Sequence, residues 1–222
     1  MTTAVPAERD LPLRERKKLR TRRALADTAL RLFLENGFDT TTVDHLVDAV
    51  EVSKRTFYAN FESKEDAALA AEIELWDAYL AEVQARDIHG PLLAALHDAL
   101  TAALQRLGDE WTRRFLPTRG LAARTPSLRN HSMLLSMSTQ ERLVQLLETK
   151  LGIDGRDDVR LRLLGEFCLS AWRCGAKNWV RGAQEPDVPS STRRKHGGIA
   201  ALIGRVDDAF TAIPDSLTLA IP

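Results

Sequence analysis

Two short helical patterns joined by a three-residue break constrain this fold more than any other feature of the chain. The first pattern predicts a helix of barely two turns, because apolar residues recur at helical spacing at Val43, Leu46, Val47 and Val50. After the break at 51–53, Ser53 is a typical N-cap for a second short helix over 54–61. Helices this short and this closely joined must cross steeply, which is a helix-turn-helix arrangement.

The second short helix has a buried side and an exposed side. Phe57 and Phe61 are four residues apart and are expected to face inward. The opposite side then presents its first turns outward, where a helix in a DNA major groove contacts base edges. The outward residues are Lys54, Arg55, Thr56 and Ala59.

Longer helical patterns flank this pair. One helix is expected from Leu13 to Asn36, with Gly37 as its stop. Thr41 with Asp44 predicts the cap of the first short helix, and Ser63 with Asp66 predicts the cap of a long helix that continues to about residue 85.

The charge of the chain is balanced overall but uneven along it. Lys and Arg number 31, as do Asp and Glu. Eight of the basic residues fall within residues 9–24, against two acidic ones, so the remainder has 23 basic and 29 acidic residues. Such a block indicates either a localised contact with a polyanion or a solvated helix face.

Composition favours an all-α protein and excludes several classes. Ala, Leu, Arg and Glu dominate the sequence, and all four favour helix. No apolar run approaches the ~18 residues of a membrane span, and the basic start has no apolar signal region, so we expect a cytoplasmic protein with no membrane partner. Cys168 and Cys174 are too far apart on one helix to pair, and both are expected in the core.

The N-terminal motifs resemble the DNA-binding domain of the TetR family of bacterial repressors. The resemblance runs without a gap over residues 22–69. Its motifs are 29–33 (Ala-Leu-Arg-Leu-Phe), Gly37-Phe38, Thr41-Thr42-Val43, 52–58 (Val-Ser-Lys-Arg-Thr-Phe-Tyr), Phe61 and Ser63-Lys64-Glu65.

This resemblance implies a role for each matching residue. Base contacts fall to Lys54, Arg55 and Thr56. Phosphate contacts, which fix register without specifying sequence, fall to Thr42, Tyr58, Asn60 and Lys64. Glu51 departs from the family, which has Gly there, so the turn either changes geometry or tolerates strain. The basic residues 14–23 contact a minor groove or the DNA backbone, or form only a charged helix face.

Helical patterns continue through the C-terminal part of the chain. They predict helices over 92–104, 125–152, 157–180 and 198–213. Another helical segment begins at Trp111 and is expected to stop at Pro117. We also expect a break at 89–91 and a polar loop at 185–192. Together they predict an antiparallel helical domain. Its last two helices have more apolar surface than one partner covers, which predicts a homodimer through them.

Scattered C-terminal positions resemble the mycofactocin-associated TetR regulators, which are taken to bind acyl-CoA-like ligands. The positions are 113–115, 121–122, 125–129, 151–153, 171–173 and Trp179. This resemblance implies a small-molecule effector, an acyl-CoA or another apolar ligand, and no other cofactor. It would lie among Trp76, Trp111, Phe115, Met133, Met137, Phe167 and Trp172, residues that could equally be plain core.

Enzyme motifs are missing from the sequence. It has no Gly-x-Gly-x-x-Gly, no phosphate-binding lysine loop and no His-Glu-x-x-His, and its five histidines are scattered singly. We therefore expect no catalytic residues, no metal site and no enzyme.

These observations combine into one expected organisation. We expect a disordered tail over 1–12, a three-helix DNA-binding domain over 13–62, an effector-binding and dimerisation domain over 63–213, and a tail over 214–222. The expected function is a ligand-responsive repressor released from a palindromic operator. The alternatives are a helical acyl- or apolar-ligand-binding protein or enzyme that retains the fold, and a ligand-independent architectural DNA-binding protein.

Overall fold

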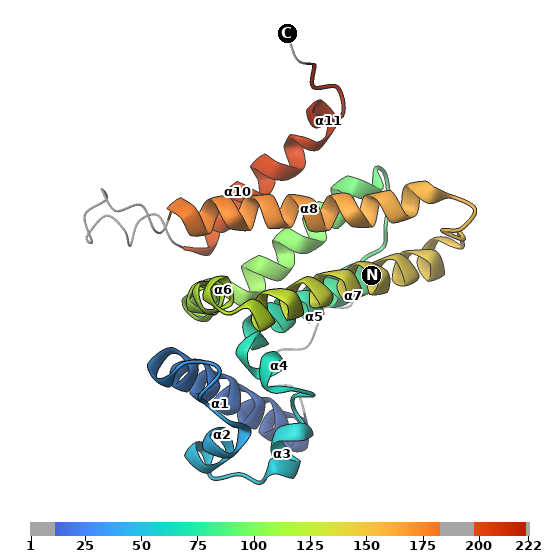
Figure 1. Ribbon diagram of the computed structural model, residues 1–222. Coiled ribbons are helices and arrows are strands. Elements are labelled where there is room, and N and C mark those ends of the chain that lie inside the picture. The colour runs from blue at the N-terminus through green and yellow to red at the C-terminus, as the bar shows by residue number, and fades with distance from the viewer. Residues whose placement is uncertain (1–11, 183–197, 221–222) are drawn as a thin grey trace. The chain divides into compact units, whose positions relative to one another are not determined.

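The computed structural model describes residues 12–182 and 198–220, and every regular element in them is helical (Figure 1). The all-α fold class is therefore confirmed. The predicted loop at 185–192 and most of the predicted N-terminal tail lie outside the described residues. The helices are α1 (Leu13–Asn36), α2 (Val43–Val50), α3 (Lys54–Tyr58), α4 (Lys64–Ala68), α5 (Ala70–Ala85), α6 (Leu92–Arg124), α7 (Pro126–Leu151), α8 (Val159–Gly182), α10 (Ile199–Thr211) and α11 (Ile213–Ser216).

The chain divides into two compact units that alternate along the sequence. The described residues of the first unit are 12–74 and 113–135, and those of the second are 75–112, 136–182 and 198–220. Helices α5, α6 and α7 therefore contribute residues to both units. Each unit is described separately below.

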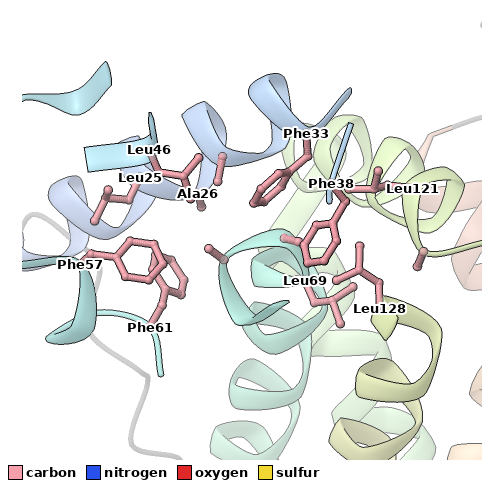
Figure 2. Close-up of a cluster of buried hydrophobic side chains, with 14 of the residues drawn as sticks. Leu25, Ala26, Phe33, Phe38, Leu46, Phe57, Phe61, Leu69, Leu121 and Leu128 are labelled. Carbon is pink, nitrogen blue, oxygen red and sulfur yellow. The ribbon is translucent and has the colours of Figure 1, made fainter. Parts of the chain in front are cut away.

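The core of the first unit joins the helix-turn-helix to a distant part of the chain (Figure 2). Helix α1 contributes a stripe at four-residue spacing, because Leu25, Ala29 and Phe33 lie on one helix face. Leu121 and Leu128, at the ends of α6 and α7, are buried in the same cluster. The remaining large side chains of the cluster are Phe38, Leu46, Phe57, Phe61 and Leu69.

The cap of α2 differs from the prediction by one residue. Thr42, not Thr41, is the N-cap: its hydroxyl accepts from the His45 amide, and the His45 ring accepts from the Thr42 amide, both at 3.3 Å. Thr41 is buried, and its hydroxyl donates to the Gly37 carbonyl at 2.8 Å. Asp44 therefore takes no part in the cap.

The other two predicted caps are confirmed. The Ser53 hydroxyl accepts from the Thr56 amide at 3.1 Å and begins α3, and the Ser63 hydroxyl accepts from the Asp66 amide at 3.0 Å and begins α4. The expected long helix after Ser63 is interrupted at Leu69, which separates α4 from α5. Helix α6 runs on through Pro117, where a stop was expected, and is kinked instead at Gly108.

Glu51 keeps the left-handed turn that glycine would favour. Its backbone angles are φ 54° and ψ 45°, and its amide bonds back to the carbonyls of Val47 and Asp48. A side chain in this region is strained by about 1 kcal/mol or more.

Replacing Glu51 with glycine is expected to raise the free energy of unfolding by about 0.5–1 kcal/mol. Urea denaturation of the wild-type protein and of Glu51→Gly measures this difference in stability. Lower stability of Glu51→Gly would show that the glutamate side chain stabilises the turn more than its backbone strains it.

In the second unit, α8 and α10 pack closely against each other (Figure 1). Their approach depends on Gly175, because a Cβ there would lie 2.7 Å from the Arg205 carbonyl oxygen and 2.8 Å from the Val206 Cα. Cys168 is buried nearby on α8, and burial raises the pKa of its thiol to about 12. Cys174 is exposed, contrary to expectation.

Replacing Gly175 with alanine is expected to cost about 1–3 kcal/mol of stability, because backbone atoms cannot move aside as a flexible side chain would. Replacing the open-sided Gly182 at the end of α8 with alanine is the matched control. Equal denaturation midpoints for the two variants would contradict the close approach.

Candidate nucleic-acid interface

Helix α3 is anchored from behind and exposed in front. The Phe57 ring is completely buried and packs against Phe61, with ring centroids 5.8 Å apart. This anchor leaves Lys54 and Arg55 exposed on the outer side. Tyr58 is 56% exposed, with its ring edge-on to Phe57. The predicted arrangement of buried aromatic and exposed basic residues is therefore present.

The three predicted base-contacting residues have different surroundings. The Lys54 ammonium lies 2.7 Å from the Asp44 carboxylate on α2, a pair that the sequence analysis did not identify. Hydrogen bonding to Asp44 raises the pKa of Lys54. The Arg55 guanidinium has no bonded partner within the described residues. The Thr56 hydroxyl lies 2.9 Å from that of Ser53.

The predicted phosphate-contacting residues surround α3. Thr42 is exposed at the start of α2, and Tyr58 is exposed at the end of α3. The Asn60 side chain donates to the Thr56 carbonyl at 2.7 Å, which closes the end of α3. The Lys64 ammonium donates to the carbonyls of Phe38 and Thr41, at 2.8 and 3.0 Å.

Lys64 thus has a structural role that its motif did not indicate. Its ammonium also lies 4.1 Å from the centre of the Phe38 ring. It fastens the start of α4 to the turn between α1 and α2, and two of its three hydrogens are already bonded. One hydrogen is left for a phosphate.

The last turn of the basic half of α1 lies beside the residues that follow α3. The Arg22 guanidinium donates to the Asn60 carbonyl and lies 4.4 Å from the centre of the Phe61 ring. Residues 13–24 of α1 contain no buried side chain. Lys18 and Arg14 lie one and two turns before Arg22 on the same side of the helix, whereas Lys17 and Arg20 lie on the opposite side.

The predicted effector residues are divided between the two units. Phe115 and Met133 belong to the first unit and the other five to the second. Trp76, Trp111, Phe115 and Trp172 are buried, whereas Met133 and Met137 are more than 60% exposed. Trp76 and Trp172 meet edge to face, with centroids 5.7 Å apart. The Trp76 Nε1 is buried without an acceptor in the described part of the chain.

A groove of about 410 Å³ lies along α8, α10 and α11 in the second unit. Phe167, a predicted effector residue, lines it together with Cys174, Ala209 and Leu217. Two further apolar residues of α8, Val159 and Leu163, are exposed.

A buried carboxylate ties three helices together in the first unit. Glu72 of α5 is 3% exposed. It accepts from Arg119 of α6 at 3.0 Å and from the Ser132 hydroxyl of α7 at 2.8 Å. Burial raises the pKa of Glu72, and Arg119 and Ser132 oppose that rise. Nothing in the sequence pattern of these helices pointed to this cluster.

The described residues contain neither a membrane-spanning helix nor a cluster suited to a metal ion. None of the described helices is long and apolar enough to cross a membrane. Residues 12–182 and 198–220 contain no group of three or more His, Cys, Asp or Glu side chains placed to hold a metal ion.

Known proteins resemble this chain in sequence. Residues 25–71 match the family described as bacterial regulatory proteins, tetR family. The chain is 33% identical to the HTH-type transcriptional regulator TcmR of Streptomyces glaucescens, over 80% of this chain and 82% of TcmR.

Solved structures with a similar fold include two bacterial regulators. A transcriptional regulator of Aquifex aeolicus is 16% identical, with a TM-score of 0.46, covering 87% of this chain and 99% of that one. The TetR family regulator PfmR of Thermus thermophilus is 20% identical, with a TM-score of 0.39, covering 85% and 98%. From its identity to TcmR over most of both chains and its helix-turn-helix match, this protein belongs to the TetR family of bacterial transcriptional regulators.

Proposed function

We propose that this regulator is a homodimeric repressor that binds a palindromic operator through α3 and leaves it when a small apolar or acyl-type effector binds. The observation that carries the proposal is α3 itself. Its buried Phe57 fixes the helix while Lys54 and Arg55 stay exposed. A rigid helix with basic residues in its first turn has the form needed to reach base edges in a major groove.

The residues around α3 support the division into base and phosphate contacts. Arg55 and Lys54 would donate to guanine, and the Thr56 methyl group would contact thymine. Thr42 at the start of α2 and Tyr58 at the end of α3 are both exposed and would contact phosphates that flank the groove. Asn60 and Lys64 would add phosphate contacts from the ends of α3 and α4, beyond the internal bonds that they already make.

A second copy would pack against α8 and α10. The groove along these helices and the exposed Val159 and Leu163 are apolar surface that a symmetric partner could cover. Two helix-turn-helix elements related by a two-fold axis match two half-sites, and each adds its own binding free energy.

Effector binding is proposed in the second unit, around Trp76 and Trp172. The aromatic rings suit an apolar ligand, and the Trp76 Nε1, which has no acceptor among the described residues, suits an oxygen acceptor such as a carbonyl. Trp111 and Phe167 belong to the same unit. Phe115 belongs to the first unit, and Met133 and Met137 are exposed. An effector that binds one conformation more tightly would shift the dimer away from the spacing that fits the operator.

Selection of duplexes from a random pool by the full chain tests the proposal. The expected product is an inverted repeat whose half-sites lie about one helical turn apart or more. Enrichment of no sequence would indicate an architectural DNA-binding protein. Failure to retain any duplex would favour a ligand-binding protein that keeps only the fold.

The basic side of α1 is expected to extend the phosphate contact beyond α3. Replacing both Arg14 and Lys18 with alanine should reduce the log–log salt slope of DNA binding by about 1.8 per head, because each lost phosphate contact changes it by about 0.9. Replacing Lys17 and Arg20 is the charge-matched control on the opposite side of α1. Equal slopes for the two double variants would show that only net charge matters.

A further inference from the structure

The Lys54 ammonium is already paired in the protein without DNA. Its Nζ lies 2.7 Å from Oδ1 of Asp44, which is in the first turn of α2, while Lys54 begins α3. Their side chains are 58% and 59% exposed, so burial does not force the contact. The pair therefore lies on the open side of the helix-turn-helix, where DNA would approach.

Neighbouring charges are arranged differently. The guanidinium of Arg55, the next residue, has no bonded partner within the described residues. Asp48 is the other exposed acid of α2, one turn after Asp44, and it influences Lys54 only through its charge. Two adjacent cations at the start of α3 thus differ, since a carboxylate holds the first and no described residue holds the second.

We propose that Asp44 is a specificity-determining residue that restrains Lys54, an inference that rests on the proposed operator binding. The ion pair holds the lysine in one place and offsets its charge. Lys54 then contributes little to binding at an arbitrary phosphate, and it adds affinity only where a base presents an acceptor within its reach.

Binding to unrelated DNA arises mainly from contacts with phosphates. Lysines and arginines that neutralise phosphates release counterions from DNA, and this release supplies nearly all of the affinity for unrelated sequences. A lysine whose charge is offset by a carboxylate gives up that contribution.

Asp44 also lies in the first turn of α2, where the helix dipole stabilises a negative charge. Asparagine at position 44 keeps the size of the side chain and removes its charge, so stability must be measured beside DNA binding. If Asp44→Asn and the wild-type protein have similar midpoints of thermal unfolding, a change in DNA binding does not come from loss of α2.

The test compares Asp44→Asn with Asp48→Asn in the full chain. Both variants remove one acidic charge from α2, but only the first frees Lys54. Affinity is measured by fluorescence anisotropy over a range of salt, for the selected inverted repeat and for an unrelated duplex of equal length.

Asp44→Asn is expected to strengthen binding to the unrelated duplex by about two- to fivefold per bound head, the scale of an exposed ion pair. Its salt slope should steepen by about 0.9 per head. The preference for the inverted repeat should fall accordingly, whereas Asp48→Asn should change both duplexes by one common, smaller factor. Equal effects of the two variants, or a preference unchanged by Asp44→Asn, would overturn the inference.

Repeating Asp44→Asn in a Lys54→Ala background isolates the pair. The gain on unrelated DNA should fall there to the small factor expected of Asp48→Asn, because no lysine remains to be freed. A larger remaining gain would mean that Asp44 acts mainly by general repulsion, which overturns the proposed restraint. Wild-type protein that binds neither duplex would instead contradict the proposed function itself.

Discussion

Replacing Arg119 with methionine is expected to destabilise the first unit by about 3 kcal/mol. Arg119 bonds to Glu72, whose carboxylate is buried among α5, α6 and α7. Removing one partner of a buried pair leaves an uncompensated charge, which costs about 3–5 kcal/mol when both groups are fully buried. The lower end applies here, because the Arg119 side chain is 34% exposed.

The stability of the same variant should depend more strongly on pH than that of the wild-type protein. Because burial raises the pKa of Glu72, the folded protein keeps a proton that the unfolded chain has released, between the ordinary and the raised pKa. Stability therefore falls as pH rises through this window. Without Arg119 the pKa rises further and the window widens. The loss should be large near neutral pH and should shrink as the pH approaches the ordinary glutamate pKa.

Urea denaturation at several pH values measures both effects. The control is Arg31→Met, which breaks the exposed pair of Arg31 and Glu35 on α1 and should cost no more than about 0.5 kcal/mol. A loss for Arg119→Met that is no larger than for Arg31→Met, or that does not change with pH, would contradict the assigned role of the Glu72 carboxylate.

Replacing Arg55 with alanine is expected to weaken operator binding by about 2–6 kcal/mol. One good arginine–guanine contact is worth about 1–3 kcal/mol, and a two-fold dimer makes the contact twice. A duplex with one intact half-site should lose only half as much free energy. The preference for one base position in each half-site should also relax.

Lys64→Ala is the contrasting variant, because its ammonium holds backbone carbonyls and would at most add a phosphate contact. It should weaken binding to every duplex alike. Competition titrations with single-base variants of the operator distinguish the two outcomes. A uniform loss from Arg55→Ala as well would show that α3 does not specify bases through Arg55.

Local patterns were sufficient for the buried face of α1 and for the start of α3. Leu25, Ala29 and Phe33 share one face by spacing alone, and Ser53 begins α3 as its residue type predicts. The cap of α2 was misplaced because Thr41 and Thr42 are both competent caps. Thr41 is buried against the carbonyl of Gly37, and that contact is not encoded in the local pattern.

Contacts between distant segments could not be read from spacing. The pairing of Asp44 with Lys54 and the bonds of Lys64 to the α1–α2 turn depend on how short helices cross. Leu121 joins the core of the first unit although it lies far along the sequence from α1. Met133 was placed near an effector by the resemblance of scattered C-terminal positions, and a resemblance of that kind does not determine which face of α7 is covered: the Met133 side chain is 62% exposed.

Binding of the full chain to the selected inverted repeat, measured by anisotropy against salt concentration, tests the central claim most directly. The account predicts two chains per duplex, a log–log slope steeper than about −3, and much weaker binding when both half-sites are scrambled. Equal affinity for the scrambled duplex, or a slope near zero, would contradict the claim that paired α3 helices bind specific DNA.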